Sequence, residues 1–131
     1  MKKKKILIVE DEKILGQMYK DKFLQSGFDT TLVNSAEEAI KKVSKIKPDL
    51  ILLDILLPKE NGIGFLTRLM KKSEFASVPV VAFSNFDDPG TKKKAFQLGI
   101  KEYLIKTNFT PSEVVAKIKQ LLKPVKRDLS L

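Results

Sequence analysis

Cysteine and histidine are both absent from this chain of 131 residues. Without cysteine there can be no disulfide framework, no thiolate catalysis, and no zinc or iron–sulfur site held by cysteine. Without histidine there can be no imidazole acid–base catalysis and no metal or haem site that depends on histidine. Any chemistry in this protein must therefore use carboxylates, hydroxyls, lysines or a hard metal ion.

Long hydrophobic runs are absent as well. The longest strand-like apolar runs are Ile6–Val9, Leu50–Leu53 and Val78–Phe83, far shorter than the roughly 20 residues of a membrane-spanning helix. The lysines at 2–5 have the charge of a signal-peptide start, but only four apolar residues follow before Glu10, and a signal peptide needs about 7–15. We therefore expect a cytoplasmic protein without a membrane span.

The composition is that of one soluble globular domain, with 43% hydrophobic and 31% charged residues. Lys and Arg number 25 against 16 Asp and Glu, which gives a net charge of +9. We expect the lysines at 2–5 and 92–94 to be solvated charge. The alternative is a basic surface that attracts an acidic partner or nucleic acid. No aromatic residues interleave with these lysines, so we expect no direct nucleic-acid binding.

Strand-like and helix-like segments alternate along the chain. Continuous apolar runs indicate buried strands, and apolar residues at helical spacing follow each of them. Strand–helix–strand crossovers are right-handed, which predicts a parallel sheet with helices on both faces. The fold class is therefore α/β, a doubly wound five-stranded sheet with five helices, whose strands are expected at 6–9, 30–33, 50–53, 80–83 and 103–105.

Capping and breaking residues support these boundaries. Gly27 and Gly99 are expected to end helices, because glycine tolerates the left-handed turn after a helix. Ser35, with Glu38 three residues later, predicts a capping box. Thr110 is expected to cap the last helix, with a proline at its first position.

Polar residues stand where the strands end, which is where ligands bind in such a sheet. Clustered carboxylates repel one another unless a cation joins them, and magnesium is the hard cation that fits an oxygen-only site. A metal beside a carboxylate and a lysine opposite it also describe a phosphoryl-transfer site. The residues that follow the strands are Glu10, Asp11 and Glu12, then Asp54, then Ser84 and Asn85, then Lys106 and Thr107.

From about Lys4 to Leu122, the sequence resembles a receiver domain of the two-component response regulators. The resemblance rests on an acidic pair after the first strand, an acceptor aspartate after the third, and a hydroxyl and a lysine at family spacing beyond it. These residues are Glu10 and Asp11 in IVEDE, Asp54 in LLDILLPKENG with Pro58 and Gly62, and Ser84, Tyr103 and Lys106.

The resemblance implies a flavodoxin-like fold with strand order 2-1-3-4-5. It also implies that Asp54 accepts a phosphoryl group from a histidine kinase or a histidine phosphotransfer protein. Mg²⁺ (or Mn²⁺) would be held by the carboxylates of Glu10, Asp11 and Asp54 and by the backbone carbonyl of Leu56. Ser84 and Lys106 would contact phosphoryl oxygens.

The same resemblance implies a switch and a signalling surface. Tyr103 would swing inward as Ser84 moves, which would change the surface of helix four, strand five and helix five. A downstream protein target, or a second copy of the chain, would dock there. Under this interpretation the protein is not an enzyme, because it would catalyse only its own phosphorylation and dephosphorylation.

Several positions depart from the family pattern. Thr107 follows Lys106 where the family usually has proline, so whether that bond is cis or trans stays open. Asn85 is larger than the usual residue after Ser84 and is expected to crowd the phosphoryl group. Leu56 and Phe86 stand where the family tunes self-hydrolysis, and neither can orient a water, so we expect slow dephosphorylation.

Other functions were weighed against this one. A haloacid-dehalogenase-like phosphatase needs a second aspartate where Leu56 stands, which argues against rapid turnover. A phosphorylation-independent interaction module on the same fold stays an alternative. We expect residues 1–123 to form the receiver domain and 124–131 a tail without an output domain. Whether the chain is free-standing or the receiver part of a longer DNA-binding regulator stays open.

Overall fold

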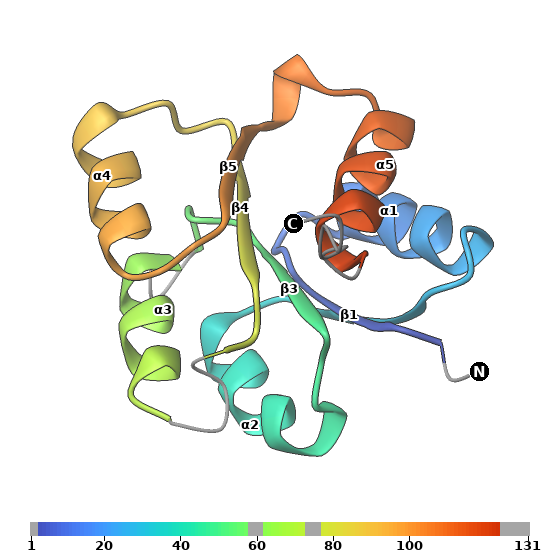
Figure 1. Ribbon diagram of the computed structural model, residues 1–131, viewed down its shortest axis with the longest axis horizontal. Coiled ribbons are helices and arrows are strands. Elements are labelled where there is room, and N and C mark those ends of the chain that lie inside the picture. The colour runs from blue at the N-terminus through green and yellow to red at the C-terminus, as the bar shows by residue number, and fades with distance from the viewer. Residues whose placement is uncertain (1–2, 58–61, 73–76, 124–131) are drawn as a thin grey trace, which may run out of the picture.

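The computed structural model describes residues 3–57, 62–72 and 77–123 (Figure 1). Its sheet has five parallel strands in the order β2-β1-β3-β4-β5. The predicted doubly wound α/β fold with flavodoxin-like strand order is therefore confirmed. The strands are β1 (Lys5–Val9), β2 (Asp29–Val33), β3 (Leu50–Leu53), β4 (Val80–Ser84) and β5 (Glu102–Ile105).

Five α-helices of the described chain cover the two faces of the sheet. Figure 1 shows α1 and α5 side by side on one face, whereas α2, α3 and α4 lie on the other. A short 3₁₀ helix, η2 (Lys106–Asn108), follows β5 and was not predicted. The α-helices are α1 (Lys13–Gln25), α2 (Ala36–Ile46), α3 (Gly62–Met70), α4 (Pro89–Gln97) and α5 (Pro111–Leu122).

Both faces of the central strands are buried, as their continuous apolar runs predict. Successive side chains of a strand point to opposite faces, so Leu7 and Val9 pack under α2 and α3, whereas Ile6 and Ile8 pack under α1 and α5. Every residue of β3 and β4 is buried. This rigid centre fixes the positions from which the residues after β1, β3 and β4 emerge.

The helix boundaries follow most of the predicted signals. The Thr110 hydroxyl accepts from the backbone N–H of Glu113, whose carboxylate accepts in return from the N–H of Thr110. Ser35 likewise caps α2 by accepting from the N–H of Glu38. The second half of that capping box is wrong, because the Glu38 carboxylate accepts from the N–H of Asn34 and from Lys42 instead of from Ser35.

Helix α4 is the most weakly anchored helix by burial. Ala95 is its only buried residue, and Phe96 is 48% exposed. Its first turn is held by the Asp88 carboxylate, which accepts from the backbone N–H and the hydroxyl of Thr91. The helix therefore depends on a cap and on contacts at its edges more than on a buried face.

Parts of the predictions fall on residues that the structure does not describe. Pro58 and the tail at 124–131 lie outside the described residues, and so does Lys2 of the lysine run. None of the helices in the described ranges is long and apolar enough to cross a membrane.

Candidate functional site

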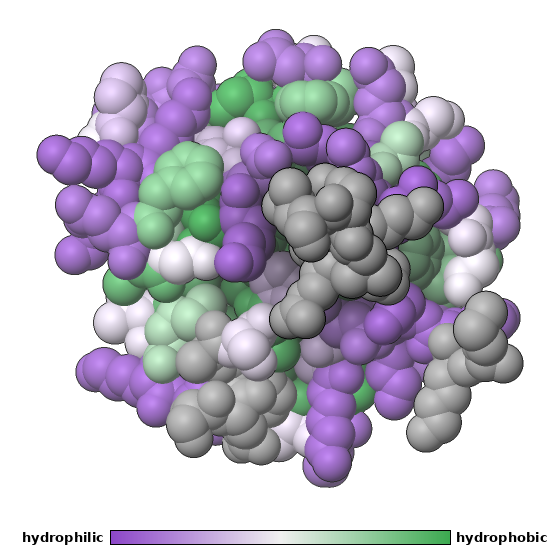
Figure 2. All heavy atoms as spheres, viewed as in Figure 1, coloured by the Kyte–Doolittle hydropathy of each residue, from purple (hydrophilic) through white to green (hydrophobic). Residues whose placement is uncertain are grey.

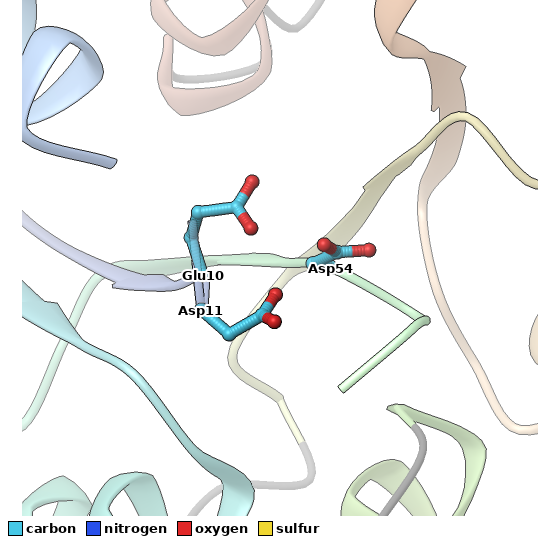
Figure 3. Close-up of side chains that lie close together, drawn as sticks. All are labelled: Glu10, Asp11 and Asp54. Carbon is cyan, nitrogen blue, oxygen red and sulfur yellow. The ribbon is translucent and has the colours of Figure 1, made fainter. Parts of the chain in front are cut away.

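Three carboxylates meet at the carboxyl ends of two neighbouring strands. Glu10 and Asp11 follow β1, and Asp54 follows β3, which pairs with β1 in parallel. Figure 3 shows Glu10 and Asp11 leaving the end of β1 in different directions, with both carboxylates on the side where Asp54 lies. Their carboxylate oxygens lie within 4.8 Å of one another. The predicted acidic cluster is therefore formed.

Asp54 is held on both of its oxygens. It is 6% exposed, and its backbone N–H donates to the carbonyl of Val9 at 2.9 Å. Its Oδ1 accepts from the backbone N–H of Leu56 at 3.0 Å, and its Oδ2 accepts from Lys106 Nζ at 3.1 Å. The orientation of the carboxylate is thus fixed, with Oδ2 directed at the Lys106 ammonium.

Lys106 bridges two of the carboxylates. Its ammonium donates to Glu10 Oε1 at 2.5 Å and to Asp54 Oδ2 at 3.1 Å. Burial favours the neutral amine, but these two carboxylates outweigh it, and the pKa of Lys106 is raised. The lysine therefore remains charged and supplies a cation to the acidic cluster.

Lys106 reaches this position from a trans backbone. The described chain has no cis peptide bond, so the Lys106–Thr107 bond is trans, which resolves the alternative left open by the sequence. Thr107 is the middle residue of η2.

Glu10 is the most electrostatically strained acid of the cluster. It is 5% exposed, and burial together with the charge of Asp54 raises its pKa to about 7, although the Lys106 ammonium opposes the shift. Its second oxygen accepts from the backbone N–H of Glu12 at 3.2 Å. A further cation beside Glu10 would relieve this strain.

The donor set fits a hard divalent ion. All three side chains offer oxygen, the donor that magnesium and manganese prefer. Lys106 contacts Glu10 and Asp54, and Asp11 is exposed to solvent. The cluster therefore holds three carboxylates against one lysine, which leaves negative charge for an ion to neutralise. The predicted role of the Leu56 carbonyl stays a prediction.

Ser84 lies at the end of β4 and is fully buried. Its hydroxyl accepts from the backbone N–H of Phe86 at 3.1 Å. The carbonyl of Phe86 in turn accepts from the Tyr103 hydroxyl at 2.6 Å. Tyr103 is half-buried, and burial raises its pKa while the neighbouring Ser84 hydroxyl lowers it. The structure thus brings Ser84 and Tyr103 together through the loop after β4.

Three predicted residues at the mouth of the site are exposed. The exposed fractions are 51% for Leu56 and 38% for Phe86, and Asn85 is exposed as well. Leu56 follows β3 and Phe86 follows β4, which is the next strand in the sheet. The mouth of the site is therefore flanked by two apolar side chains.

Gly62 is required by a close approach of the chain to Asp54. Its backbone N–H donates to the carbonyl of Ile55 at 2.6 Å. A Cβ added at Gly62 would lie 2.8 Å from Ile55 Cα and 3.0 Å from the carbonyl oxygen of Asp54. Any larger residue would displace the backbone that carries Asp54.

Two supporting residues were not predicted. The ring of Phe83 lies under Lys106, with Nζ 5.6 Å from its centroid, and Tyr19 packs edge-on against that ring. The Lys92 ammonium lies 5.6 Å from the centroid of the Tyr103 ring and pairs with Asp87. In the sequence, Phe83 is an ordinary strand residue and Lys92 is one of three consecutive lysines. No local pattern therefore indicates that either residue supports the site.

Comparison with known families gives one match across most of the chain. The model of the response regulator receiver domain matches residues 6–119. That range contains every residue of the cluster and every predicted contact around it.

Curated relatives agree with this match. The chain is 35% identical over 120 residues to the alkaline phosphatase synthesis transcriptional regulatory protein PhoP of Bacillus subtilis, covering 92% of the chain and 49% of that protein. It is 31% identical over 122 residues to the phosphate regulon transcriptional regulatory protein PhoB of Escherichia coli, covering 93% and 53%. The chain spans about half the length of the curated relatives it matches.

Solved structures have the same fold. A putative response regulator from Chloroflexus aurantiacus is 28% identical with a TM-score of 0.83, covering 92% of this chain and 98% of that one. The BeF₃-activated receiver domain of RstA from Klebsiella pneumoniae is 25% identical with a TM-score of 0.82, covering 92% and 99%. The chemotaxis protein CheY4 of Vibrio cholerae, 22% identical with a TM-score of 0.85 and coverage of 91% and 98%, supports the fold alone.

Proposed function

The chain belongs to the response regulator receiver domain family, and from this premise we propose that Asp54 accepts the phosphoryl group of a two-component pathway. The donor is a phosphohistidine on a histidine kinase or on a histidine phosphotransfer protein. The phosphorylated domain then signals by contact with a downstream protein. Residues 1–123 form the receiver domain in this proposal.

One observation supports the proposal above all others. Asp54 lies at the end of a central buried strand, with a lysine ammonium on one oxygen and two further carboxylates within 4.8 Å. A structural ion pair would need only one acid for one lysine. The surplus of carboxylates around Asp54 fits a site that takes up cations and a phosphoryl group instead.

The transfer itself requires few groups. A carboxylate oxygen of Asp54 attacks phosphorus, the bond from phosphorus to the histidine nitrogen breaks, and the electron pair stays on that nitrogen. Lys106 then shifts from Asp54 to a phosphoryl oxygen, which its position 3.1 Å from Oδ2 allows. The Ser84 hydroxyl donates to another phosphoryl oxygen.

Glu10, Asp11 and Asp54 would hold Mg²⁺ or Mn²⁺, with the Leu56 carbonyl as a further ligand. When bound, the ion supplies positive charge that neutralises the phosphoryl oxygens. Asp11 is the exposed member of the cluster and has no contact with Lys106. Its exposed carboxylate is therefore the one best placed to recruit the ion from solvent.

The signal passes from Ser84 to Tyr103 in this proposal. The Ser84 hydroxyl, the Phe86 backbone and the Tyr103 hydroxyl form a continuous chain of hydrogen bonds. A shift of Ser84 toward a phosphoryl group would break the first bond and release the loop to which Tyr103 is tied. The surface of α4, β5 and α5 would change as a result, and a partner protein or a second copy of the chain would dock there.

Intact-mass measurement tests the proposal. Native protein incubated with acetyl phosphate and magnesium should gain one phosphoryl mass, and the gain should be lost with a metal chelator. Asp54→Asn preserves the size of the side chain and should gain none, whereas Glu12→Gln, a change at an exposed acid nearby, should behave like the native protein. Equal labelling of native protein and Asp54→Asn would overturn the proposal.

A further inference from the structure

Lysines gather on the edge of the sheet opposite to the acidic site. We define the basic edge by seven lysines of the described chain that lie outside its helices and strands, on the segments that lead into strands or leave helices. They are Lys3, Lys4, Lys47, Lys71, Lys72, Lys101 and Lys123.

The topology brings these segments to one edge. All strands are parallel, so they begin at the same edge, and each helix returns the chain to it (Figure 1). Backbone hydrogen bonds join neighbouring segments at this edge. The carbonyl of Lys4 accepts from the N–H of Asp29 at 3.0 Å, and the N–H of Lys101 donates to the carbonyl of Val80 at 2.8 Å. In Figure 2, hydrophilic side chains project around most of the outline, including the lower margin below the connection from α2 to β3.

The lysines of the basic edge are not neutralised within the described chain. None of the seven takes part in an ion pair there. The described ion-paired lysines are at 41, 42, 92, 106 and 117, and of these Lys117 pairs with an acid at this edge, Glu102. Among the described residues, the acids on these connections and at the first residues of the strands are Asp29, Asp49 and Glu102. Asp49 accepts from the backbone N–H of Lys5, and Glu102 pairs with Lys117. Positive charge therefore dominates this edge.

Helix stability explains only part of the arrangement. A lysine in the last turn of a helix is favourable to the helix dipole, and Lys22, Lys45 and Lys119 have that position. Within the basic edge, Lys47 and Lys123 are the C-cap residues of α2 and α5, where the same dipole favours them, whereas Lys3, Lys4 and Lys101 lie before β1 and β5. Like charges closer than the screening length of about 8 Å at physiological salt repel one another, so an external anion would relieve the edge.

We propose that the basic edge binds the surface of a membrane that contains anionic lipids. Lysine acts as a hydrated point charge and lacks the forked geometry with which arginine grips a single phosphate or carboxylate. Protein interfaces are depleted in lysine and rely on aromatic and arginine anchors. The described part of the edge presents no helix or ribbon that could enter a DNA groove. Mobile anionic headgroups can rearrange to meet lysines that are spread over several separate segments.

Two exposed apolar side chains support the same partner. Leu24 and Phe96 are the next-to-last residues of α1 and α4, which both end at the basic edge, and they are 44% and 48% exposed. Leucine and phenylalanine are side chains that insert at a membrane interface beside lysines. In this orientation the acidic site faces away from the lipid and stays open to a phosphoryl donor.

Vesicle sedimentation tests the proposal with the full chain. The protein should sediment with vesicles of equal parts phosphatidylglycerol and phosphatidylcholine at low ionic strength, but not with phosphatidylcholine alone. Each lysine at an anionic surface contributes roughly fivefold to binding. The triple variant Lys4→Gln, Lys71→Gln, Lys101→Gln should therefore bind about 100-fold more weakly.

A matched triple variant separates this edge from net charge. Lys20→Gln, Lys41→Gln, Lys93→Gln removes the same charge from lysines elsewhere and should bind within severalfold of the native protein. Equal losses in the two triple variants would overturn the proposal, as would tighter binding to a DNA duplex than to anionic vesicles at the same salt. Asp54→Asn should bind vesicles normally, so the outcome does not depend on the proposed phosphorylation.

Discussion

At the scale of single residues, the site is organised around one lysine shared by two buried acids. Lys106 neutralises Asp54 and Glu10 together, and Phe83 supports its side chain from below. Buried charges are costly unless paired, and one ammonium only partly compensates three carboxylates. The site can therefore take up further positive charge, and without it the folded protein is less stable.

Glu10 should make the metal-free protein less stable as the pH rises. Its pKa is about 7 in the folded state, against 4.5 for an ordinary glutamate. Between these values the folded protein keeps a proton that the unfolded chain has lost, so the free energy of unfolding falls as the pH rises through this window and is constant above it. The full effect is at most roughly 3 kcal/mol.

Urea unfolding in the presence of a chelator checks this expectation. Glu10→Gln should gain stability relative to the native protein as the pH is raised from about 5 to about 8. Glu12→Gln is the control, since that side chain is exposed. If the difference between Glu10→Gln and native protein does not change with pH, the pKa of Glu10 is not raised in the folded protein.

Leu56 and Phe86 should make the phosphorylated state long-lived. Both side chains flank the mouth of the site and cannot hydrogen-bond a water for attack on phosphorus. Hydrolysis without a positioned water loses much of the proximity contribution to its rate. The phosphoryl group on native protein should therefore decay at least about tenfold more slowly than in Leu56→Asn, Phe86→Glu. Decay of the native protein at the same rate or faster would contradict this.

At the scale of elements, α4 is the part best suited to move. It has one buried residue, Ala95, and its Lys92 contacts the ring of Tyr103 in β5. Elements with few buried contacts open locally at low cost. A change at Ser84 can therefore alter α4 and β5 without disturbing the central strands.

Hydrogen exchange with beryllofluoride and magnesium should reveal this movement. Amides within residues 85–106 should change their exchange, because the chain of hydrogen bonds from Ser84 to Tyr103 is rearranged. Amides of β1 and β3 should not change, since these strands are buried on both faces. Full occupancy of Asp54 with an unaltered pattern over 85–106 would rule out this switch.

The sequence predicted most of this architecture because its signals were local. The apolar runs located the strands, Ser35 and Thr110 marked helix starts, and the residues after each strand located the acidic cluster. The partner of the Glu38 carboxylate was not predictable, because Asn34 and Lys42 compete for it only in the folded geometry.

Long-range contacts at the site could not be predicted from the sequence either. The bridge from Lys106 to both Glu10 and Asp54 depends on the path of the chain after β5, where the trans bond to Thr107 and η2 set the direction. The contacts of Phe83 and Lys92 arise only once the strands and α4 are assembled. Spacing along the chain encodes none of these distances.

At the scale of the whole molecule, charge is separated between two ends of the sheet. Carboxylates gather where the strands end, and lysines without an ion pair among the described residues gather where the strands begin. The net charge of +9 thus conceals an acidic site at which cations accumulate. A divalent ion should consequently stabilise the entire fold.

Thermal unfolding should show this stabilisation. At a magnesium concentration ten times its Kd, binding adds about 1.4 kcal/mol, which raises Tm by roughly 4–7 °C. Asp11→Asn should abolish the rise, and it should fold normally because Asp11 is exposed. An equal rise in native protein and Asp11→Asn would place the ion elsewhere.

The most direct test of the central claim is to identify the residue that carries the phosphoryl group. Borohydride reduces an aspartyl phosphate to homoserine, so the protein can be phosphorylated with acetyl phosphate and magnesium, reduced, digested and sequenced by mass spectrometry. We predict homoserine at position 54 and aspartate at position 11. Homoserine at another position, or unmodified Asp54 in protein that has gained a phosphoryl mass, would contradict the account.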